Sequence, residues 1–263
     1  MTILKNIYGN FKNYSYLMQQ MIARDFKVKY KRSVLGILWS LLYPLLMMSV
    51  MALVFSQMFR FNVPGVNYLV YLMTGLVFFN YFSEATNWSL QSIVSNFSLL
   101  NKVYIPKYIF PLSKCLFVGI NFLLSLIPLL LIIVITGSPI SWNYLFLPYV
   151  FICLLLFTIG IGFLISTISV FLRDMIYIYG IILIMWMYFT PIFYSITMLP
   201  EIMQRLIKFN PLYQFITFAR TILLDAATPS LLQFLACFIC AVVVFIIGTV
   251  VFRANQDKFI YYI

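Results

Sequence analysis

The sequence predicts an all-α integral membrane protein, and three observations lead to this fold class. The chain has 263 residues, of which 64% are hydrophobic and only 9% are charged, whereas soluble domains carry about 25% charged residues. Its apolar residues form long continuous runs rather than an alternating pattern, which favours helices over a β-barrel. The basic residues gather in short runs beside those apolar segments. We therefore expect one membrane domain rather than a water-soluble fold.

Residues 1–33 are predicted to form a cytoplasmic amphipathic segment that lies in the membrane interface. Apolar side chains recur there at three- to four-residue spacing, with polar ones between them: Phe11, Tyr14, Met18, Met21 and Ile22. Next, Phe26, Val28 and Tyr30 alternate with lysines, so this helix is expected to end before the first span begins. Two interpretations stay open: a topology signal on a lipid-surface helix, or a docking surface for a cytoplasmic partner.

Residues 34–263 are predicted to form one transmembrane domain with six spanning helices. A span needs about 20 mostly apolar residues, and six stretches qualify: 34–59, 68–90, 109–136, 144–171, 175–195 and 230–252. Six crossings place both termini on one side. Thirteen of the 17 Lys and Arg residues fall in segments of that side, against four on the other, which are Arg60, Arg205, Lys208 and Arg220. This asymmetry predicts that both termini are cytoplasmic.

Two connections differ from ordinary loops. Between the second and third spans, Ile93, Phe97 and Leu100 mark one face of a short cytoplasmic helix within 92–105, which suits insertion into a groove on another protein; an interfacial turn resting on lipid is the alternative. Between the fifth and sixth spans, 196–229 contains two short helical patterns separated at Asn210-Pro211. Both are too short to cross the membrane, so we expect a re-entrant external hairpin, with a cap lying flat on the surface as the alternative.

The chemistry of the chain argues against an enzyme. It has no histidine and only six acidic residues, which makes metal and acid/base catalysis improbable. No phosphate-binding loop motif occurs. The four cysteines lie in or beside apolar runs, as buried apolar residues do. Glu84 is the one acidic residue in a predicted span; it is a functional candidate by location, or a partner in a structural hydrogen bond. We expect no catalytic residue, metal or cofactor in this chain, and no binding of nucleic acid.

The ordered set of motifs resembles a known family. The stretches RDFKVKYKRSVLGILWSLLYPLL, SNFSLLNKVYIPKYIFPLS, FLRDM, TPIFY and NPLYQFITFAR follow one another over essentially the whole chain. They are similar to those of the membrane subunits of ABC-2 type exporters, which export lipid-linked polysaccharides such as O-antigen, capsule and teichoic acid chains. The one departure is mild: Thr190 stands where serine is commoner in the family.

The resemblance implies partners and site residues. Such permeases are multi-pass homodimers of the bacterial cytoplasmic (inner) membrane, and they bind two copies of an ABC ATPase, which holds ATP and Mg²⁺. The 92–105 segment would be the coupling helix, with the ATPase contacted by Phe97, Leu99, Leu100, Asn101 and Lys102. The hairpin would be the external gate, with Pro191, Tyr194, Pro200, Asn210 and Pro211. The diphosphate of an undecaprenyl-linked glycan would be attracted by Arg24, Lys27, Lys29, Lys31 and Arg32.

The abundant aromatic residues fit a channel for sugars. The chain has 19 Tyr, 27 Phe and 4 Trp, more than two interfacial belts require. Candidates for the channel wall are Trp39, Tyr43, Tyr177, Trp186 and Tyr188, although each also suits a lipid belt or helix packing. Two other functions stay open: an ABC-2 type exporter of a small molecule or drug, and an ATP-independent secondary transporter. A secondary transporter is expected to have several intramembrane ionisable groups or an inverted repeat, and the sequence shows neither.

Overall fold

The computed structural model describes residues 2–31, 33, 35–58, 67–100, 102 and 105–262, and within these ranges every regular element is helical. The α-helices are α1 (Thr2–Tyr30), α2 (Trp39–Met58), α3 (Tyr68–Leu90), α4 (Phe97–Leu100), α5 (Ile109–Ile135), α6 (Leu147–Phe171), α7 (Met175–Phe189), α8 (Glu201–Ile207), α9 (Pro211–Leu223), α10 (Leu231–Asn255) and α11 (Phe259–Tyr262). Single 3-10 turns are η1 (Gly36–Leu38), η2 (Val94–Asn96), η3 (Trp142–Phe146), η4 (Ile196–Met198) and η5 (Gln256–Lys258).

A helix lies in each of the six stretches expected to span the membrane, and α3 has the expected bounds. Among the described residues, three helical segments are long and apolar enough to cross a bilayer: Ile109–Ile135, Trp142–Phe171 and Leu231–Tyr262. Helix α7 is apolar but has only 15 residues, which gives a length of about 22 Å. A membrane protein with several passes is thus supported, while the full count of six spans stays a prediction.

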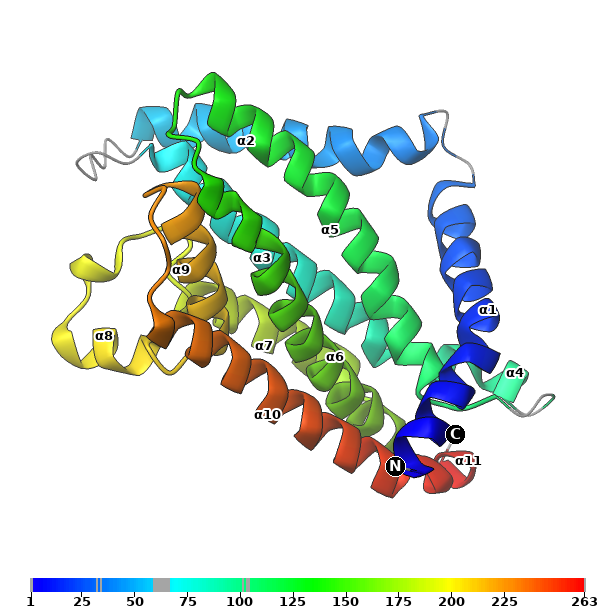
Figure 1. The fold of residues 1–263 in the computed structure, drawn as a ribbon. Coiled ribbons are helices and arrows are strands. Elements are labelled where there is room, and N and C mark those ends of the chain that lie inside the picture. The colour runs from blue at the N-terminus through cyan, green and yellow to red at the C-terminus, as the bar shows by residue number, and fades with distance from the viewer. Residues whose placement is uncertain are drawn as a thin grey trace.

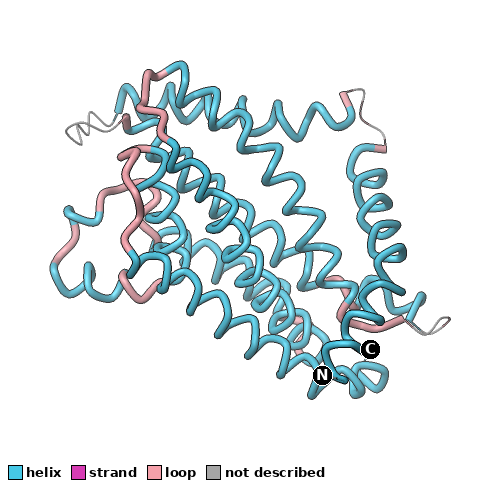
Figure 2. The backbone as a smooth tube through the Cα atoms, in the orientation of Figure 1, coloured by secondary structure: helices cyan, strands magenta, loops and turns pink. Residues whose placement is uncertain are grey.

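The long helices form a bundle with two distinct ends. Helices α3, α5, α6 and α10 pack side by side, while α1 and α2 run at an angle to them and each contacts α5 (Figures 1 and 2). The start of α1, the short helix α4 and the C-terminal α11 lie at one end of this bundle, and α8 and α9 lie toward the other (Figure 1). We call these the terminal end and the distal end. A shared end for both termini is what an even number of crossings requires.

Helix α1 covers most of the expected N-terminal segment. It continues through the alternating apolar side chains and lysines from Phe26 onward and ends at Tyr30, before α2 begins at Trp39, as expected. Met21 on α1 is buried in a small cluster with Ile105, Ile109 and Phe110, at the beginning of α5. The helix therefore uses one apolar face to pack on the protein itself.

The two halves of the expected hairpin are packed very differently. Helix α9 lies in the main core, where eight of its residues are buried, among them Phe215, Phe218 and Arg220. In helix α8 only Ile207 is buried. Ile202 and Leu206 of the same helix, and Phe209 just after it, are largely exposed. The two helices are separated as expected: Asn210 caps α9 by accepting a hydrogen bond from the Leu212 amide (3.1 Å), and Pro211 occupies its first turn.

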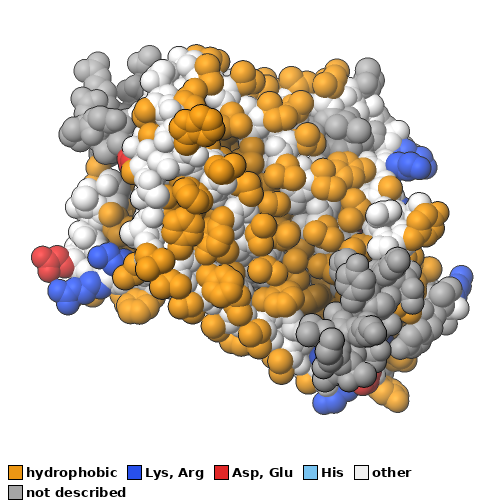
Figure 3. Space-filling view, in the orientation of Figure 1, with side chains coloured by type: hydrophobic (Ala, Val, Ile, Leu, Met, Phe, Trp, Pro, Cys, Tyr) orange, Lys and Arg blue, Asp and Glu red, His pale blue; other side chains and the backbone are white. Residues whose placement is uncertain are grey.

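Hydrophobic side chains cover most of the visible surface of the bundle (Figure 3). In that view the charged side chains stand at the edges rather than across the middle. Within Leu231–Tyr262, only 17% of the most apolar window is buried in the protein. An apolar face of this size needs an apolar solvent, and the acyl chains of a membrane supply one.

Helices α6 and α10 approach each other closely through two glycines. A methyl group at Gly160 would lie 2.6 Å from the carbonyl oxygen of Val244, and one at Gly248 would meet the backbone of Gly160. Small residues at such contacts let helix backbones pack tightly, which matters where no hydrophobic effect drives the helices together. The α6–α10 pairing thus depends on the absence of side chains at these two positions.

We predict that Gly160→Ala or Gly248→Ala lowers stability, because the extra methyl forces the two backbones apart. Overpacking of this kind costs about 1–3 kcal/mol, and thermal unfolding of the purified chain in detergent would measure it. Gly180→Ala in α7 is the matched control, since a methyl there meets nothing within 4 Å. Equal unfolding temperatures for all three variants would contradict this account of α6–α10 packing.

Candidate functional site

A buried ion pair joins α1 to α5 at the terminal end of the bundle. The Lys114 Nζ atom donates to the Asp25 Oδ2 atom at 2.6 Å, and the side chains are only 7% and 8% exposed. Lys114 also lies over the ring of Trp88 from α3, 5.2 Å from its centroid. A buried pair of this kind is costly to break, because removing Asp25 leaves the buried Lys114 ammonium group without a counterion. It therefore fixes α1 against the start of α5.

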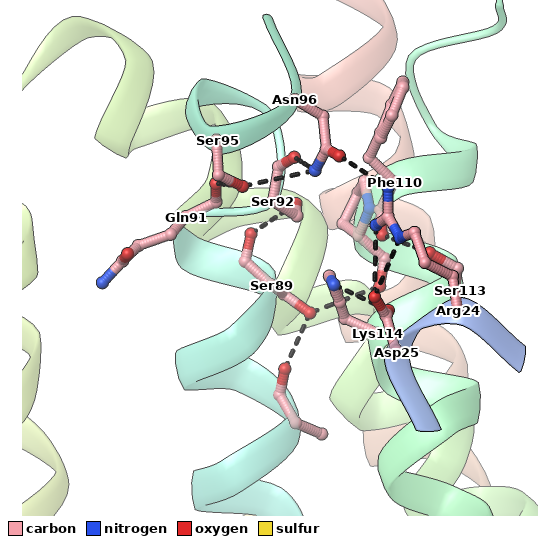
Figure 4. Close-up of polar contacts among 12 residues, drawn as sticks. Arg24, Asp25, Ser89, Gln91, Ser92, Ser95, Asn96, Phe110, Ser113 and Lys114 are labelled. Atoms are coloured by element: carbon pink, nitrogen blue, oxygen red, sulfur yellow. Dashed lines mark hydrogen bonds and ion pairs between the residues drawn. The ribbon is translucent and has the colours of Figure 1, made fainter. Parts of the chain in front are cut away.

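A second contact joins α1 to the segment before α4 (Figure 4). Arg24 donates to the Asp25 carboxylate at 3.1 Å and, with its other terminal nitrogen, to the Asn96 Oδ1 atom at 3.2 Å. Asn96 in turn donates to the Ser92 carbonyl at 2.8 Å. Three segments that are far apart in the sequence thus meet through four side chains. We call Arg24, Asp25, Asn96 and Lys114 the terminal junction.

Other contacts of α1 extend this junction along α3 and α5. Lys29 forms an ion pair with Glu84 at 2.8 Å, and these side chains are 31% and 39% exposed. Glu84 therefore has a basic partner that the sequence did not reveal. The ring of Phe26 packs edge-on against Phe117 of α5, with centroids 4.7 Å apart. The ion pair is more exposed than the Asp25–Lys114 pair and so contributes less to stability.

The residues expected to contact an ATPase lie on a shorter helix than the sequence suggested. Helical structure covers Val94–Leu100, as η2 followed by α4, rather than 92–105. Leu99 and Leu100 are half-buried and pack against the Met21 cluster, while Phe97 is half-buried and Lys102 is exposed. Asn101 lies outside the described residues. The exposed positions of this segment include Val94 and Ser98.

The basic stretch of α1 borders a cavity. A cavity of about 1000 Å³ opens between α1, the start of α2 and α5. Its lining combines cationic and apolar side chains: Arg24, Lys27 and Lys31 with Leu35, Leu41 and Leu124. Of the five basic residues expected to meet a headgroup, three thus line one cavity and Lys29 is paired with Glu84. Arg32 lies outside the described residues.

A buried arginine organises the distal end. Arg220 of α9 donates to three carbonyl oxygens: Pro191 at 2.8 Å, Tyr71 at 3.1 Å and Ile192 at 3.3 Å. Its guanidinium also lies on the Tyr71 ring, 3.4 Å from the centroid. Burial lowers the pKa of Arg220 to about 10, so the group stays charged at neutral pH. A planar guanidinium suits this role because its donors point in several fixed directions.

Tyrosines and an asparagine complete this second site, which we call the distal junction: Tyr68, Tyr71, the 190–194 turn, Asn210 and Arg220. The Tyr71 hydroxyl donates to the Tyr194 carbonyl at 2.9 Å, and the Tyr68 hydroxyl donates to the Phe193 carbonyl at 2.9 Å. The Asn210 side chain accepts from the Trp186 indole and donates to Thr190, each at 2.9 Å. The junction ties α3, the end of α7 and α9 together.

Comparison with known proteins gives the chain its family. The model of the ABC-2 type transporter family matches residues 16–224. The chain belongs to the ABC-2 type transporter family. An O-antigen export system permease protein of Klebsiella pneumoniae is 31% identical over 208 residues, which cover 78% of this chain and 80% of that protein. One of Myxococcus xanthus is 28% identical over 249 residues (94% and 95%). A polysialic acid transport protein of Escherichia coli is 22% identical over 247 residues (91% and 93%).

The residues proposed for the gate and the channel of this ABC-2 transporter occupy different environments. Pro191 and Asn210 belong to the distal junction, Pro200 precedes α8, and Pro211 opens α9. The Tyr194 hydroxyl donates to the Tyr188 carbonyl at 2.7 Å. Among the aromatic candidates, Trp186 packs between helices against Phe82 and Phe157. The other four are exposed: Trp39, Tyr43, Tyr177 and Tyr188.

Several residues of these junctions were not found from the sequence. From the sequence, Arg220 was counted only as an external charge and Lys114 only as a cytoplasmic one, and Asp25 and Asn96 were given no role. One signal was available for Arg220. It lies on the same face of α9 as Ile216, one turn earlier, and as Leu223, so its position belongs to the buried side of an amphipathic helix. The partners of Asp25 and Asn96 lie 89 and 72 residues away, and no local pattern marks them.

We predict that Arg220→Gln destabilises the chain strongly, because several carbonyls of the 190–194 turn and α3 lose a donor. Each buried carbonyl left without a partner costs about 1–3 kcal/mol, so the unfolding temperature should fall by several degrees. Arg205→Gln is the control, since the Arg205 side chain is 81% exposed. A similar unfolding temperature for the two variants would show that the distal junction does not stabilise the fold.

Proposed function

We propose that this chain is the permease subunit of an ABC transporter that exports a polysaccharide across the cytoplasmic membrane, with energy supplied by a separate ATPase subunit. The observation that carries the proposal is the similarity to O-antigen export permeases over nearly the whole chain. A capsule polysaccharide export inner-membrane protein of Neisseria meningitidis is also similar. The partner, the substrate and the membrane are taken from these relatives and from the family.

The other two candidate functions have less support. These relatives are named for the transport of O-antigen, polysialic acid or capsule polysaccharide, which favours a polysaccharide over a small molecule or drug. Membership of an ABC transporter family favours an ATP-driven complex over an ATP-independent secondary transporter. In such a complex the ATPase subunit binds ATP and Mg²⁺, and this chain provides the path through the membrane.

The terminal end suits the attachment of the ATPase. It combines α4, the start of α1 and α11 (Figure 1), and it carries exposed basic residues such as Lys102, Arg253 and Lys258. The positive charge supports a cytoplasmic position for this end. In the proposed complex two copies of the permease form a homodimer, and two ATPase subunits dock on the segments Val94–Leu100.

The cavity beside α1 suits the head of an undecaprenyl-linked glycan. Lys27 and Lys31 supply positive charge for a diphosphate, and the leucines from α2 and α5 supply an apolar wall for the lipid. Such a ligand joins an anionic head to a long apolar chain, and the cavity offers both environments within about 1000 Å³. We place the entry of the substrate from the cytoplasmic leaflet here, between α1 and α2.

The function can be tested in cells that lack this chain. We expect such cells to retain the glycan inside, and the intact chain to restore it to the surface. Val94→Asp combined with Ser98→Asp should not restore export, because two exposed positions one helical turn apart would then place charge in the ATPase interface. Ala227→Asp, at the distal end, is the control and should restore export.

Surface glycan and co-purification of the ATPase would be measured for each variant. Export without this chain, or ATPase bound equally by the double variant, would contradict the proposal. In the first case the transported substrate is different. In the second case the ATPase attaches to another surface.

We further predict that Lys27→Gln combined with Lys31→Gln weakens stimulation of ATP hydrolysis by the lipid-linked substrate. Each basic residue near a membrane surface contributes about 1 kcal/mol to the attraction of anionic groups, so the half-saturating substrate concentration should rise about 30-fold. Lys258→Gln removes an exposed charge at the same end and should leave stimulation intact. An unchanged half-saturating concentration in the double variant would reduce this stretch to a membrane anchor.

A further inference from the structure

The Asp25–Lys114 pair is the buried charged contact that holds α1 on α5, next to the apolar Met21 cluster. Both side chains are buried and their atoms are 2.6 Å apart, so separating them exposes two charges to an apolar interior. Further along α1, Phe26 packs edge-on against Phe117. Lys29 forms a partly exposed ion pair with Glu84 and lies over the Phe117 ring at 5.5 Å. These contacts can break and re-form at a smaller cost. Helix α1 is therefore held firmly at Asp25 and more weakly beyond it.

Arg24 joins this fixed point to the short cytoplasmic segment. Its guanidinium binds the Asp25 carboxylate on one side and the Asn96 oxygen on the other (Figure 4). Asn96 is itself held by the Ser92 carbonyl and by the Ser95 hydroxyl, at 2.8 and 3.2 Å. It sits at the end of η2, directly before α4. A displacement of this segment therefore pulls on α1 beside its fixed point.

The same part of α1 forms one wall of the cavity. Arg24 belongs to the terminal junction and also lines the cavity, together with Ala23 and Lys27 on either side of it. A rotation of α1 about Asp25 would thus change the distance between this wall and the start of α2. The neighbouring residues Arg24 and Asp25 contact each other, and they contact Asn96 and Lys114 respectively. A small shift at Asn96 would therefore move the cavity wall that contains Arg24.

We propose that Asp25 and Asn96 are positioning residues that link the ATPase-facing segment to the substrate cavity. Asp25 is the pivot that holds α1 on α5, and Asn96 is the polar attachment through which the segment moves α1, beside the apolar packing of Leu99 and Leu100 on the Met21 cluster. This inference rests on the proposed function, because it assigns the movement of the segment to the ATPase. It adds a specific route by which the state of the nucleotide sets the width of the cavity.

The test measures the width of the cavity in the assembled complex. Spin labels at Val28 on α1 and Leu38 in η1, both exposed and both lining the cavity, report the distance between its walls. The four native cysteines are replaced by Ser or Ala, and the complex is studied in lipid nanodiscs with and without ATP. We expect a nucleotide-dependent shift in this distance for the otherwise unmodified chain.

Two pairs of variants separate positioning from mere stability. Asn96→Leu removes the oxygen that Arg24 binds, and the shift should disappear while the ATPase still co-purifies. Asn96→Asp keeps an acceptor at this place and should keep the shift. Asp25→Asn should lose the shift and Asp25→Glu should keep it. Glu84→Gln is the matched control, because it removes the exposed ion pair of α1 without touching the terminal junction.

The outcomes distinguish this inference from the proposed function. Failure of the unmodified chain to bind an ATPase would overturn the proposed function itself. If the ATPase binds, a shift that persists in Asn96→Leu would overturn the link, as would the absence of any shift in the unmodified chain. Loss of ATPase binding in Asn96→Leu would also overturn it, because Asn96 would then contact the ATPase rather than α1. Asn96→Leu leaves the buried ion pair intact, so its result stands even where Asp25→Asn does not fold.

Discussion

The removal of charge from water is the constraint on which the rest of this structure depends. A chain that is only 9% charged and presents an apolar surface to lipid can bury a charge only where a partner meets it. At the terminal end Asp25 and Lys114 satisfy each other at 2.6 Å, and this pair decides where α1 lies on α5. The position of α1 in turn gives Asn96 its partner and forms the cavity wall.

The two junctions solve the same problem with different chemistry. The terminal junction pairs a carboxylate with an ammonium group, whereas Arg220 at the distal junction is held by carbonyl oxygens and a tyrosine ring. An ion pair separates into two charges when it breaks, but an arginine held by carbonyls can exchange one acceptor for another. This difference is compatible with the external gate that the family resemblance implies for this hairpin, because α9 is anchored in the core while most of α8 is exposed.

Much of the fold could be predicted from the sequence, because hydropathy and proline positions act locally. The bounds of α3, the break at Asn210-Pro211 and the cap of α9 follow from residues a few positions apart. The sites could not be found in this way. Lys29 and Glu84 are separated by 55 residues. In the sequence, Asn96 is one of several polar residues in a short segment, and only the structure shows that Arg24 donates to it. The short helix is also smaller than its apolar pattern suggested: it ends at Leu100, which packs with Leu99 against the Met21 cluster.

The dense positive charge at the end of α1 therefore has at least three uses, and they divide by residue. Arg24 joins α1 to the segment before α4, and Lys29 pairs with Glu84 on α3. Lys27 and Lys31 line the cavity. All of them add to the positive charge that we expect to orient the first span, since that effect depends on number rather than position. If these charges were shifted by one residue along α1, the orientation of the first span would be kept, because the number of charges is the same. The contacts of Arg24 and Lys27 would be lost, because one residue turns a side chain by about 100° around the helix axis. The spacing of the charges, more than their number, is what fits this stretch to the terminal junction.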